Sequence, residues 1–334
     1  MEERERRIGV VGATGALGAE VLAILEERRF PVAELRVFAS ERSLGEEIEC
    51  MGESVKVEVG DPRLAGLDLV FLCAPPSVSL EAARHALKAE VPCIDLSGVL
   101  AARDEVPLVA DGSEGIAVGS AHPLIAVPAG AGVAWYRVLK PLHEAAGLTR
   151  AVATQLVPAS SGGRDGIEAL RAETVALFGQ QDSPEPAYFG AAVAFDCLPW
   201  VDEVGEGGFS AQEAALMRDL RRLLGGAELS LVVAAVRVPT FCGEGAVFFV
   251  ETERELSPEQ AVELFQRAPG VCYWGGPTAG PTTRESAGRD VVLVGRVRRD
   301  PSARQGLCLW LAADVLRIAA TSGVQLAERW LLHN

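Results

Sequence analysis

The stretch Gly9-Val-Val-Gly12-Ala-Thr-Gly15-Ala-Leu-Gly18 decides the fold, because it joins the apolar run Ile8 to Val11 to a segment with helical periodicity, Ala19 to Glu27. Glycines let the chain turn tightly and approach a pyrophosphate, and a helix N-terminus offers N–H groups and a positive dipole end. The stretch therefore predicts a phosphate-binding turn, with the candidate residues Gly12, Thr14, Gly15, Ala16, Leu17 and Gly18. The alternative is a glycine-rich turn without a ligand.

Strand-like and helix-like segments alternate through the first half of the chain. After the glycine turn, the strand-like segments are Leu35 to Ala39, Leu67 to Cys73, Val91 to Leu96 and Leu124 to Val127, and a helix is expected from Ser79 to Ala89. This alternation predicts an α/β fold with a doubly wound parallel sheet.

The pattern changes after about residue 133. Helices are expected from Val133 to Ala145, Asp165 to Phe178, Ala211 to Leu224 and Ala313 to Leu332, and strands at Ala151 to Val157, Leu229 to Val238, Ala246 to Thr252, Val291 to Arg298 and Leu307 to Ala312. The long β runs predict a second, α+β domain with a mixed or antiparallel sheet. The apolar runs from residues 229 and 246 also suit a dimer surface, and an ordinary two-sided core is the alternative.

The end of the second strand bears on the choice of nucleotide. It reads Phe38-Ala-Ser40-Glu-Arg42-Ser43. An NAD site usually places an acidic residue here, whereas Ser40, Arg42 and Ser43 suit a 2′-phosphate. We therefore expect NADP; Glu41 keeps NAD open, and a merely polar turn is the remaining alternative.

Composition excludes several classes of partner. The chain of 334 residues is 49% hydrophobic and carries a net charge of −15, which disfavours nucleic acid and anionic membranes. Its seven scattered cysteines include no C-x-x-C pair, which is typical of reduced thiols in a cytoplasmic protein and predicts no metal site. Neither a signal peptide nor a membrane span is expected.

Several motifs in order resemble the aspartate-semialdehyde dehydrogenase family over essentially the whole chain. They are Gly12-Ala-Thr-Gly15-Ala-Leu-Gly18, Val70 to Ser79, Ile94-Asp-Leu-Ser97, Lys140-Pro-Leu-His143, Arg237-Val-Pro-Thr-Phe, Val250-Glu-Thr, Val294-Gly-Arg-Val-Arg-Arg-Asp300 and Leu309-Trp-Leu-Ala-Ala-Asp314. The resemblance implies an NADP-binding Rossmann-like domain (residues 1–132 and 313–334), a dimerisation and substrate domain (residues 133–312), and a homodimer. It also implies semialdehyde chemistry in amino-acid biosynthesis, in which a thiolate attacks the aldehyde before hydride passes to NADP.

The resemblance also shows which catalytic groups are missing. The nucleophile slot holds Gly130, and no cysteine lies between Cys93 and Cys197. The histidine slot, seven residues after Arg237, holds Glu244. Losing a nucleophile that works with its base costs about 10⁴ to 10⁶ in turnover.

Other slots are partly retained. The family's orienting glutamine maps to Val157, with Gln155 close by, and Arg237 keeps the slot that clamps the substrate carboxylate. The family's phosphate-holding arginine maps to Ala101. A Glu-x-Lys element of the family maps to Glu213 and Ala215, so its lysine is absent.

These losses favour a catalytically silent, Usg-like homologue that keeps the fold, the cofactor and the dimer, with a regulatory or structural role. Two alternatives stay open: hydride transfer without a covalent intermediate, with Glu244 as acid, and a relocated nucleophile at Cys242. A carboxylate near Cys242 makes a poor activator, and such a cysteine is more often a small buried hydrophobe. The glycines of Ala129-Gly-Ala-Gly132 either bind an anion through backbone N–H groups or merely fill a vacated pocket.

Overall fold

The computed structural model describes residues 5–60, 62–110, 123–128, 130–182, 185, 187–226, 228–275 and 279–332. The chain forms two compact units, Met1–Ala129 with Leu316–Asn334, and Gly130–Val315. The boundaries expected from the sequence lie at 132/133 and 312/313. No described helix is both long enough and apolar enough to cross a membrane.

The first unit is built on a seven-stranded sheet in the order β3-β4-β2-β1-β5-β6-β7. Its strands are β1 (Arg6–Val11), β2 (Val32–Ala39), β3 (Glu47–Cys50), β4 (Glu53–Val59), β5 (Leu69–Leu72), β6 (Cys93–Asp95) and β7 (Leu124–Ala126). Its helices are α1 (Ala16–Glu27), the 3₁₀ turn η1 (Glu41–Ser43), α2 (Pro76–Lys88) and α8 (Val315–Leu332). All neighbouring strands are parallel except β3 and β4.

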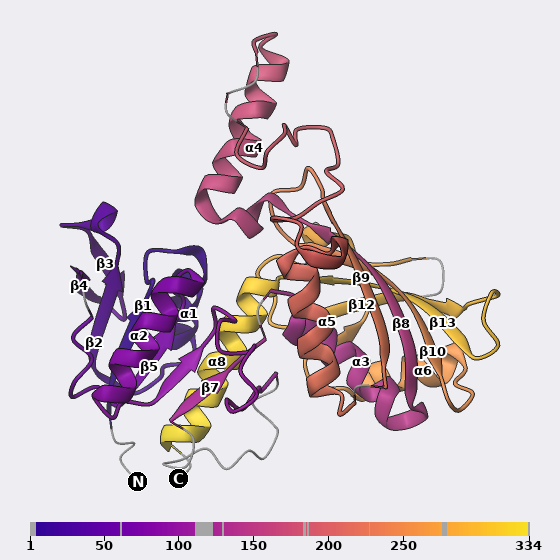
Figure 1. The fold of residues 1–334 in the computed structure, drawn as a ribbon, viewed down its shortest axis with the longest axis horizontal. Helices are drawn as coiled ribbons and strands as arrows, with labels where there is room; N and C mark the ends of the chain where they lie inside the picture. The colour runs from indigo at the N-terminus through magenta and orange to yellow at the C-terminus, as the bar shows by residue number, and fades with distance from the viewer. Residues whose placement is uncertain are drawn as a thin grey trace. The chain divides into compact units, whose positions relative to one another are not determined.

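The central strands of this sheet are apolar because both faces are covered. Every residue of β5 is buried, as are the last four residues of β1. The C-terminal helix α8 belongs to this unit and lies beside α1, to which it is tied by ion pairs of Arg28 with Glu328 (2.6 Å) and Arg317 with Glu27 (2.5 Å). In Figure 1 it is the yellow helix near β7.

The second unit is built on a six-stranded mixed sheet in the order β11-β12-β13-β10-β8-β9. Its strands are β8 (Leu148–Val157), β9 (Ser230–Arg237), β10 (Glu244–Thr252), β11 (Val271–Tyr273), β12 (Val292–Arg299) and β13 (Gly306–Ala313). Its helices are α3 (Gly132–Ala146), η2 (Ala159–Gly162), α4 (Gly163–Phe178), η3 (Glu206–Gly208), α5 (Ala211–Leu223), α6 (Pro258–Arg267) and α7 (Thr283–Ser286).

The two faces of this second sheet differ. On β10, Phe248 is fully buried and meets the ring of Trp135 on α3 edge to face, with centroids 4.6 Å apart, whereas Phe249 points to the other face and is 39% exposed. Phe249 lies opposite Val152, and Val152 lies opposite Val232, which is also 39% exposed. One face is therefore the core under α3, and the other carries an apolar row of Phe249, Val152 and Val232.

Helix α4 stands away from that sheet (Figure 1). It is held by the segment after it: Leu170 packs with Val193 and Leu198, and the buried carboxylate of Glu173 accepts hydrogen bonds from the N–H groups of Val193 (2.7 Å) and Ala194 (3.0 Å).

The predicted fold class is confirmed: a Rossmann-like parallel-dominated sheet and a second domain with a mixed sheet. Among the strands and α-helices of the described residues, five were not predicted: β3, β4, α6, β11 and α7. Three of them, β3, β11 and α7, have four residues or fewer, and β3 and β4 form a half-exposed hairpin rather than a buried parallel pair.

Candidate functional site: a nucleotide cavity and a depleted catalytic site

The glycine turn forms one wall of a cavity of about 610 Å³ in the first unit. Of the predicted cofactor residues, Gly12, Thr14, Gly15, Ser40 and Arg42 line this cavity. It opens at the carboxyl end of β1, whose neighbours in the sheet are β2 on one side and β5 on the other. Ligands of open α/β sheets bind at such a switch point.

Two glycines of the turn are required by close packing. Gly12 has φ +87°, and a Cβ there would lie 2.7 Å from the backbone N of Ala74. A Cβ on Gly18 would lie 2.2 Å from the carbonyl oxygen of Gly12, so only glycine lets α1 begin this close to the turn. These are the positions at which a nucleotide-binding turn needs glycine.

The start of α1 supplies the anion-binding groups. Its N-cap residue Gly15 has no side-chain cap, and its first turn contains no acidic residue. Ala16, Leu17 and Gly18 form that first turn, where N–H groups lack acceptors within the helix. They are not among the cavity-lining residues, so any role they have is through their backbone N–H groups. A pyrophosphate fits this arrangement.

Of the three residues at the end of β2 that are expected to bind a 2′-phosphate, two line the cavity and one does not. Ser40 and Arg42 line the cavity together with Glu41. Ser43 is buried instead, and its hydroxyl donates a hydrogen bond of 3.2 Å to the Thr14 hydroxyl. Ser43 thus ties the β2 end to the glycine turn.

Sequence reasoning missed the opposite wall of the cavity. The missed lining residues come from α2 and from the ends of β1, β2, β4 and β5, or directly follow those ends: Val11, Phe38, Ala39, Gly60, Pro62, Cys73, Ala74, Pro75, Val78, Glu81 and Ala82. The available signal was positional, because the carboxyl ends of neighbouring parallel strands meet at one edge of a sheet.

The residue at the position of the family's nucleophile is Gly130, which has no side chain. Gly130 has φ +55°, and a Cβ built there would meet no atom within 4 Å. The slot therefore has space for a side chain, although its backbone conformation favours glycine. Ala129 of the same loop lies outside the described residues.

The slot of the catalytic histidine holds a carboxyl group in a buried environment. Glu244, at the start of β10, is 3% exposed. Burial raises its pKa to about 8, and the nearby Gln155 amide offsets this only in part. Gln155 on β8 is fully buried, whereas Val157, the mapped glutamine slot, packs with Val201 and Ala235.

Arg237, expected to clamp a substrate carboxylate, is buried and engaged within its own unit. Its guanidinium donates hydrogen bonds to the Ser161 hydroxyl (2.8 Å) and to the Pro158 carbonyl (3.4 Å). The Phe189 ring covers it, with 3.9 Å between the guanidinium carbon and the ring centroid. Burial lowers the pKa of Arg237.

The structure also bears on the interpretations of Cys242 and Glu213. Cys242 is exposed, so its interpretation as a small buried hydrophobe is wrong. Its position in the loop before β10, outside the sheet, leaves it uncovered. Glu213, in the slot of a Glu-x-Lys element, accepts hydrogen bonds from the N–H groups of Ser210 and Ala235, both at 2.7 Å, so its carboxylate ties α5 to β9.

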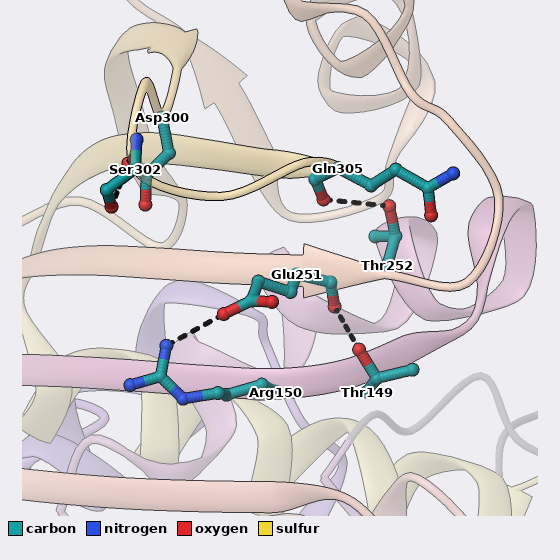
Figure 2. Close-up of polar contacts among 7 residues, drawn as sticks. All are labelled: Thr149, Arg150, Glu251, Thr252, Asp300, Ser302 and Gln305. Carbon is teal, nitrogen blue, oxygen red and sulfur yellow. Dashed lines mark hydrogen bonds and ion pairs between the residues drawn. The ribbon is translucent and has the colours of Figure 1, made fainter.

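A polar cluster at the far end of the β8–β10 pair differs from the Glu244 environment. Arg150 donates to Glu251 at 2.8 Å, and the Thr149 hydroxyl donates to the Glu251 carbonyl at 3.2 Å (Figure 2). In the adjoining β12–β13 turn, the Ser302 hydroxyl bonds Asp300, whose pKa is lowered by those bonds. These groups satisfy one another, which is typical of a structural cluster.

Among the described residues no group of three histidine, cysteine, aspartate or glutamate side chains lies close enough together to hold a metal ion.

The comparisons with known proteins agree with this geometry. Residues 7–114 match the model "Semialdehyde dehydrogenase, NAD binding domain", and residues 139–318 match "Semialdehyde dehydrogenase, dimerisation domain". The chain belongs to the aspartate-semialdehyde dehydrogenase family. The family expectation made from the motif order is thus confirmed.

Individual relatives match over nearly the full length. The chain is 34% identical to the aspartate-semialdehyde dehydrogenase of Aquifex aeolicus, over 96% of this chain and 97% of the relative. It is 31% identical to a USG-1 protein homolog of Azotobacter vinelandii, over 96% of each. The crystal structure of aspartate semialdehyde dehydrogenase II from Vibrio cholerae superposes with a TM-score of 0.93 at 31% identity, covering 98% of both chains.

Proposed function

We propose that this protein is a catalytically silent, Usg-like member of the family that binds NAD(P) and acts in a regulatory or structural role. The observation that carries the proposal is the state of the two catalytic slots: Gly130 offers no nucleophile, and Glu244 offers a buried carboxyl group in place of a histidine base. A general base alone is worth about 10² to 10⁴ in rate. An intact nucleotide turn beside these losses fits a cofactor-holding homologue.

The favoured cofactor is NADP. The 610 Å³ cavity, the uncapped start of α1 and the position of Arg42 on the lining support this assignment. Arg42 suits a 2′-phosphate because a guanidinium binds phosphate oxygens through paired N–H groups. Glu41 lines the same cavity, and NAD is the alternative it supports.

The proposed partner is a second copy of the chain, in the cytoplasm. The dimerisation-domain match and the apolar row of Phe249, Val152 and Val232 support this proposal. A contiguous apolar patch on a sheet face is typical of a protein interface. A regulatory role through pairing with an active dehydrogenase of the family would use the same surface.

A second candidate function is hydride transfer without a covalent intermediate. The observation favouring it is that Glu244, with a pKa of about 8, keeps its proton at neutral pH and is available as an acid. In this alternative the protein is an active NADP-dependent semialdehyde oxidoreductase, and its turnover fails in Glu244→Gln. A nucleophile at the exposed Cys242 predicts instead that Cys242→Ala abolishes turnover.

The test combines calorimetric titration of NADPH and NADP with an aspartate-semialdehyde and phosphate assay on the same preparation. Binding without turnover is the expected result. Turnover near the rates of active family members would overturn the silent assignment, and the Glu244→Gln and Cys242→Ala variants would then identify the replacement group. Absence of binding would overturn the cofactor assignment.

A further inference from the structure

A second cavity adjoins the nucleotide cavity within the first unit. Its volume is about 660 Å³, and the described residues that line it are Glu58, Val59, Pro62, Arg63 and His85. Pro62 lines the nucleotide cavity as well. The two cavities therefore share a wall at Pro62, and the second one is called the Arg63 pocket below.

Helix α2 contributes to both cavities. Val78, Glu81 and Ala82 line the nucleotide cavity, and His85 lines the Arg63 pocket. Because residues four apart lie on the same face of a helix, Glu81 and His85 follow each other along one face of α2. The carboxylate of this face thus belongs to the nucleotide cavity, and the imidazole belongs to the Arg63 pocket.

The segment that follows β4 holds the backbone of Arg63 in place. Arg36 of β2 donates a hydrogen bond from Nη1 to the Arg63 carbonyl. The next residue, Leu64, is only 2% exposed, whereas the Arg63 side chain is exposed. A cation on such an anchored backbone loses less conformational freedom on binding a ligand than a cation on a mobile loop does.

The charges around the Arg63 pocket leave a positive group without a partner. Glu58 is the acid among the described lining residues, and its Oε1 and Oε2 accept hydrogen bonds from Nε and Nη2 of Arg36, both at 2.7 Å. The negative charge of Glu58 is therefore balanced within this pair. Among the described residues, no side-chain hydrogen bond or ion pair engages the Arg63 guanidinium or the His85 imidazole.

We propose that the Arg63 pocket binds a phosphate group, which Arg63 holds from the segment after β4 and His85 holds from α2. A guanidinium offers paired N–H groups to phosphate oxygens, and an imidazole adds a further donor. The cavity volume leaves room for the organic part of a small phosphomonoester. The phosphate group comes either from a free ligand of this kind or from a nucleotide that extends past Pro62.

The proposal goes beyond the proposed function and is tested without a nucleotide. Inorganic phosphate is the probe, and the nucleotide-free full chain is the sample. Calorimetric binding of NADP is a separate measurement, so the failure of one proposal is distinguishable from the failure of the other. Because the chain carries a net charge of −15, unspecific adsorption of phosphate is disfavoured, and a saturable response reports a local site.

The test follows the histidine ring resonances by NMR while inorganic phosphate is added at pH 7, with the ionic strength held constant by potassium chloride. The chain has four histidines, and the His85 signal is identified by its absence in His85→Gln. We expect phosphate to shift the His85 signal saturably and chloride to leave it unchanged.

Two variants with the same change of charge sharpen the result. Arg63→Ala should weaken phosphate binding by about five- to tenfold, because it removes charge-assisted hydrogen bonds from an exposed guanidinium. Arg84→Ala is the matched control, since Arg84 is an exposed residue of α2 that lines neither cavity, and its phosphate affinity should stay within about twofold of the wild type.

A repeat in saturating NADP distinguishes the two sources of the phosphate group. Displacement of inorganic phosphate identifies the nucleotide as the source, and an unchanged phosphate affinity identifies a separate ligand; both results support the site. Three results would overturn it: no saturable shift of His85 with phosphate, an equal shift with chloride, or equal losses of affinity in Arg63→Ala and Arg84→Ala. The comparison of phosphate with chloride uses the wild type and is sufficient even if a variant fails to fold.

Discussion

The ring of Phe189 covers the guanidinium of Arg237, whose central carbon lies 3.9 Å from the ring centroid. Phe189 comes from the segment after α4, and Arg237 ends β9. Because the same guanidinium also bonds Ser161, one buried cation joins three parts of the second unit. The retained family arginine therefore has a structural role here whether or not it meets a ligand.

Removing the ring should destabilise the protein. Phe189→Ala loses a desolvated cation–π contact and partly buried apolar area, so we expect the free energy of unfolding to fall by about 2–3 kcal/mol. Urea denaturation measures this change. Phe241→Ala is the matched control, because Phe241 is 46% exposed, and it should change the free energy by less than about 1 kcal/mol. Equal effects of both variants would contradict the structural role of the stack.

Glu244 predicts a specific dependence of stability on pH. Its pKa is about 8 in the folded protein, whereas the ordinary pKa of a glutamate is 4.5. Between these two pH values the folded state therefore binds more protons than the unfolded state. The stability that the protonated group contributes is complete below pH 4.5 and is lost as pH rises through about 8. The slope approaches about 1.4 kcal/mol per pH unit.

The measurement is the free energy of unfolding of wild type and Glu244→Gln from pH 5 to pH 9. Burial also raises the pKa values of Asp95 and Asp219, so both proteins share that background slope. We expect Glu244→Gln to become more stable relative to the wild type as the pH rises. Glu251→Gln, the control on the same strand, should show no such change in relative stability. Parallel curves for wild type and Glu244→Gln would show that the Glu244 pKa is not raised.

The parts of the fold that follow from local pattern were predictable. The turn from Gly9 to Gly18 and the fully apolar β5 predicted a parallel sheet because both strand faces are buried. The β3–β4 hairpin was not predicted because it turns at Met51 and Gly52, both with positive φ, without the Asn-Gly pair that usually signals such a turn. Helix α6 did carry a signal, the capping box of Ser257 and Gln260.

The site was predictable only where one residue type decides the chemistry. Absence of a thiol at Gly130 is visible in the sequence, and so is a carboxyl group at Glu244. The burial of Glu244, and the diagonal position of Gln155 beside it, follow from strand register and packing, which the sequence does not contain. Likewise, the bond between Ser43 and Thr14 depends on how the β2 end meets the glycine turn.

Arg42 should decide the choice between NADP and NAD. A charge-assisted hydrogen bond to a phosphate is worth about 1.5–3 kcal/mol, so Arg42→Ala should weaken NADPH binding by roughly 10- to 100-fold and leave NADH binding within about twofold. Calorimetric titration of both nucleotides measures this. Glu41→Ala is the neighbouring control, expected to weaken NADH and not NADPH. An equal loss for both nucleotides in Arg42→Ala would contradict a contact with the 2′-phosphate.

Restoring the two missing groups should restore part of the family chemistry. A Cβ at Gly130 meets no atom within 4 Å, so Gly130→Cys adds a thiol at a cost of about 1–2 kcal/mol for its positive φ. Without a base that thiol is a weak nucleophile, and we expect the single variant to be alkylated by iodoacetamide yet nearly inactive.

Adding Glu244→His supplies the base. The double variant should then oxidise aspartate semialdehyde, in the presence of phosphate and NADP, about 10² to 10⁴ times faster than Gly130→Cys alone. NADPH absorbance measures the rate, and Glu244→His alone is the control that lacks a nucleophile. If the double variant is no faster than Gly130→Cys, loss at these two slots does not account for silence, and the absent cations at the Ala101 and Ala215 slots become the limiting deficit.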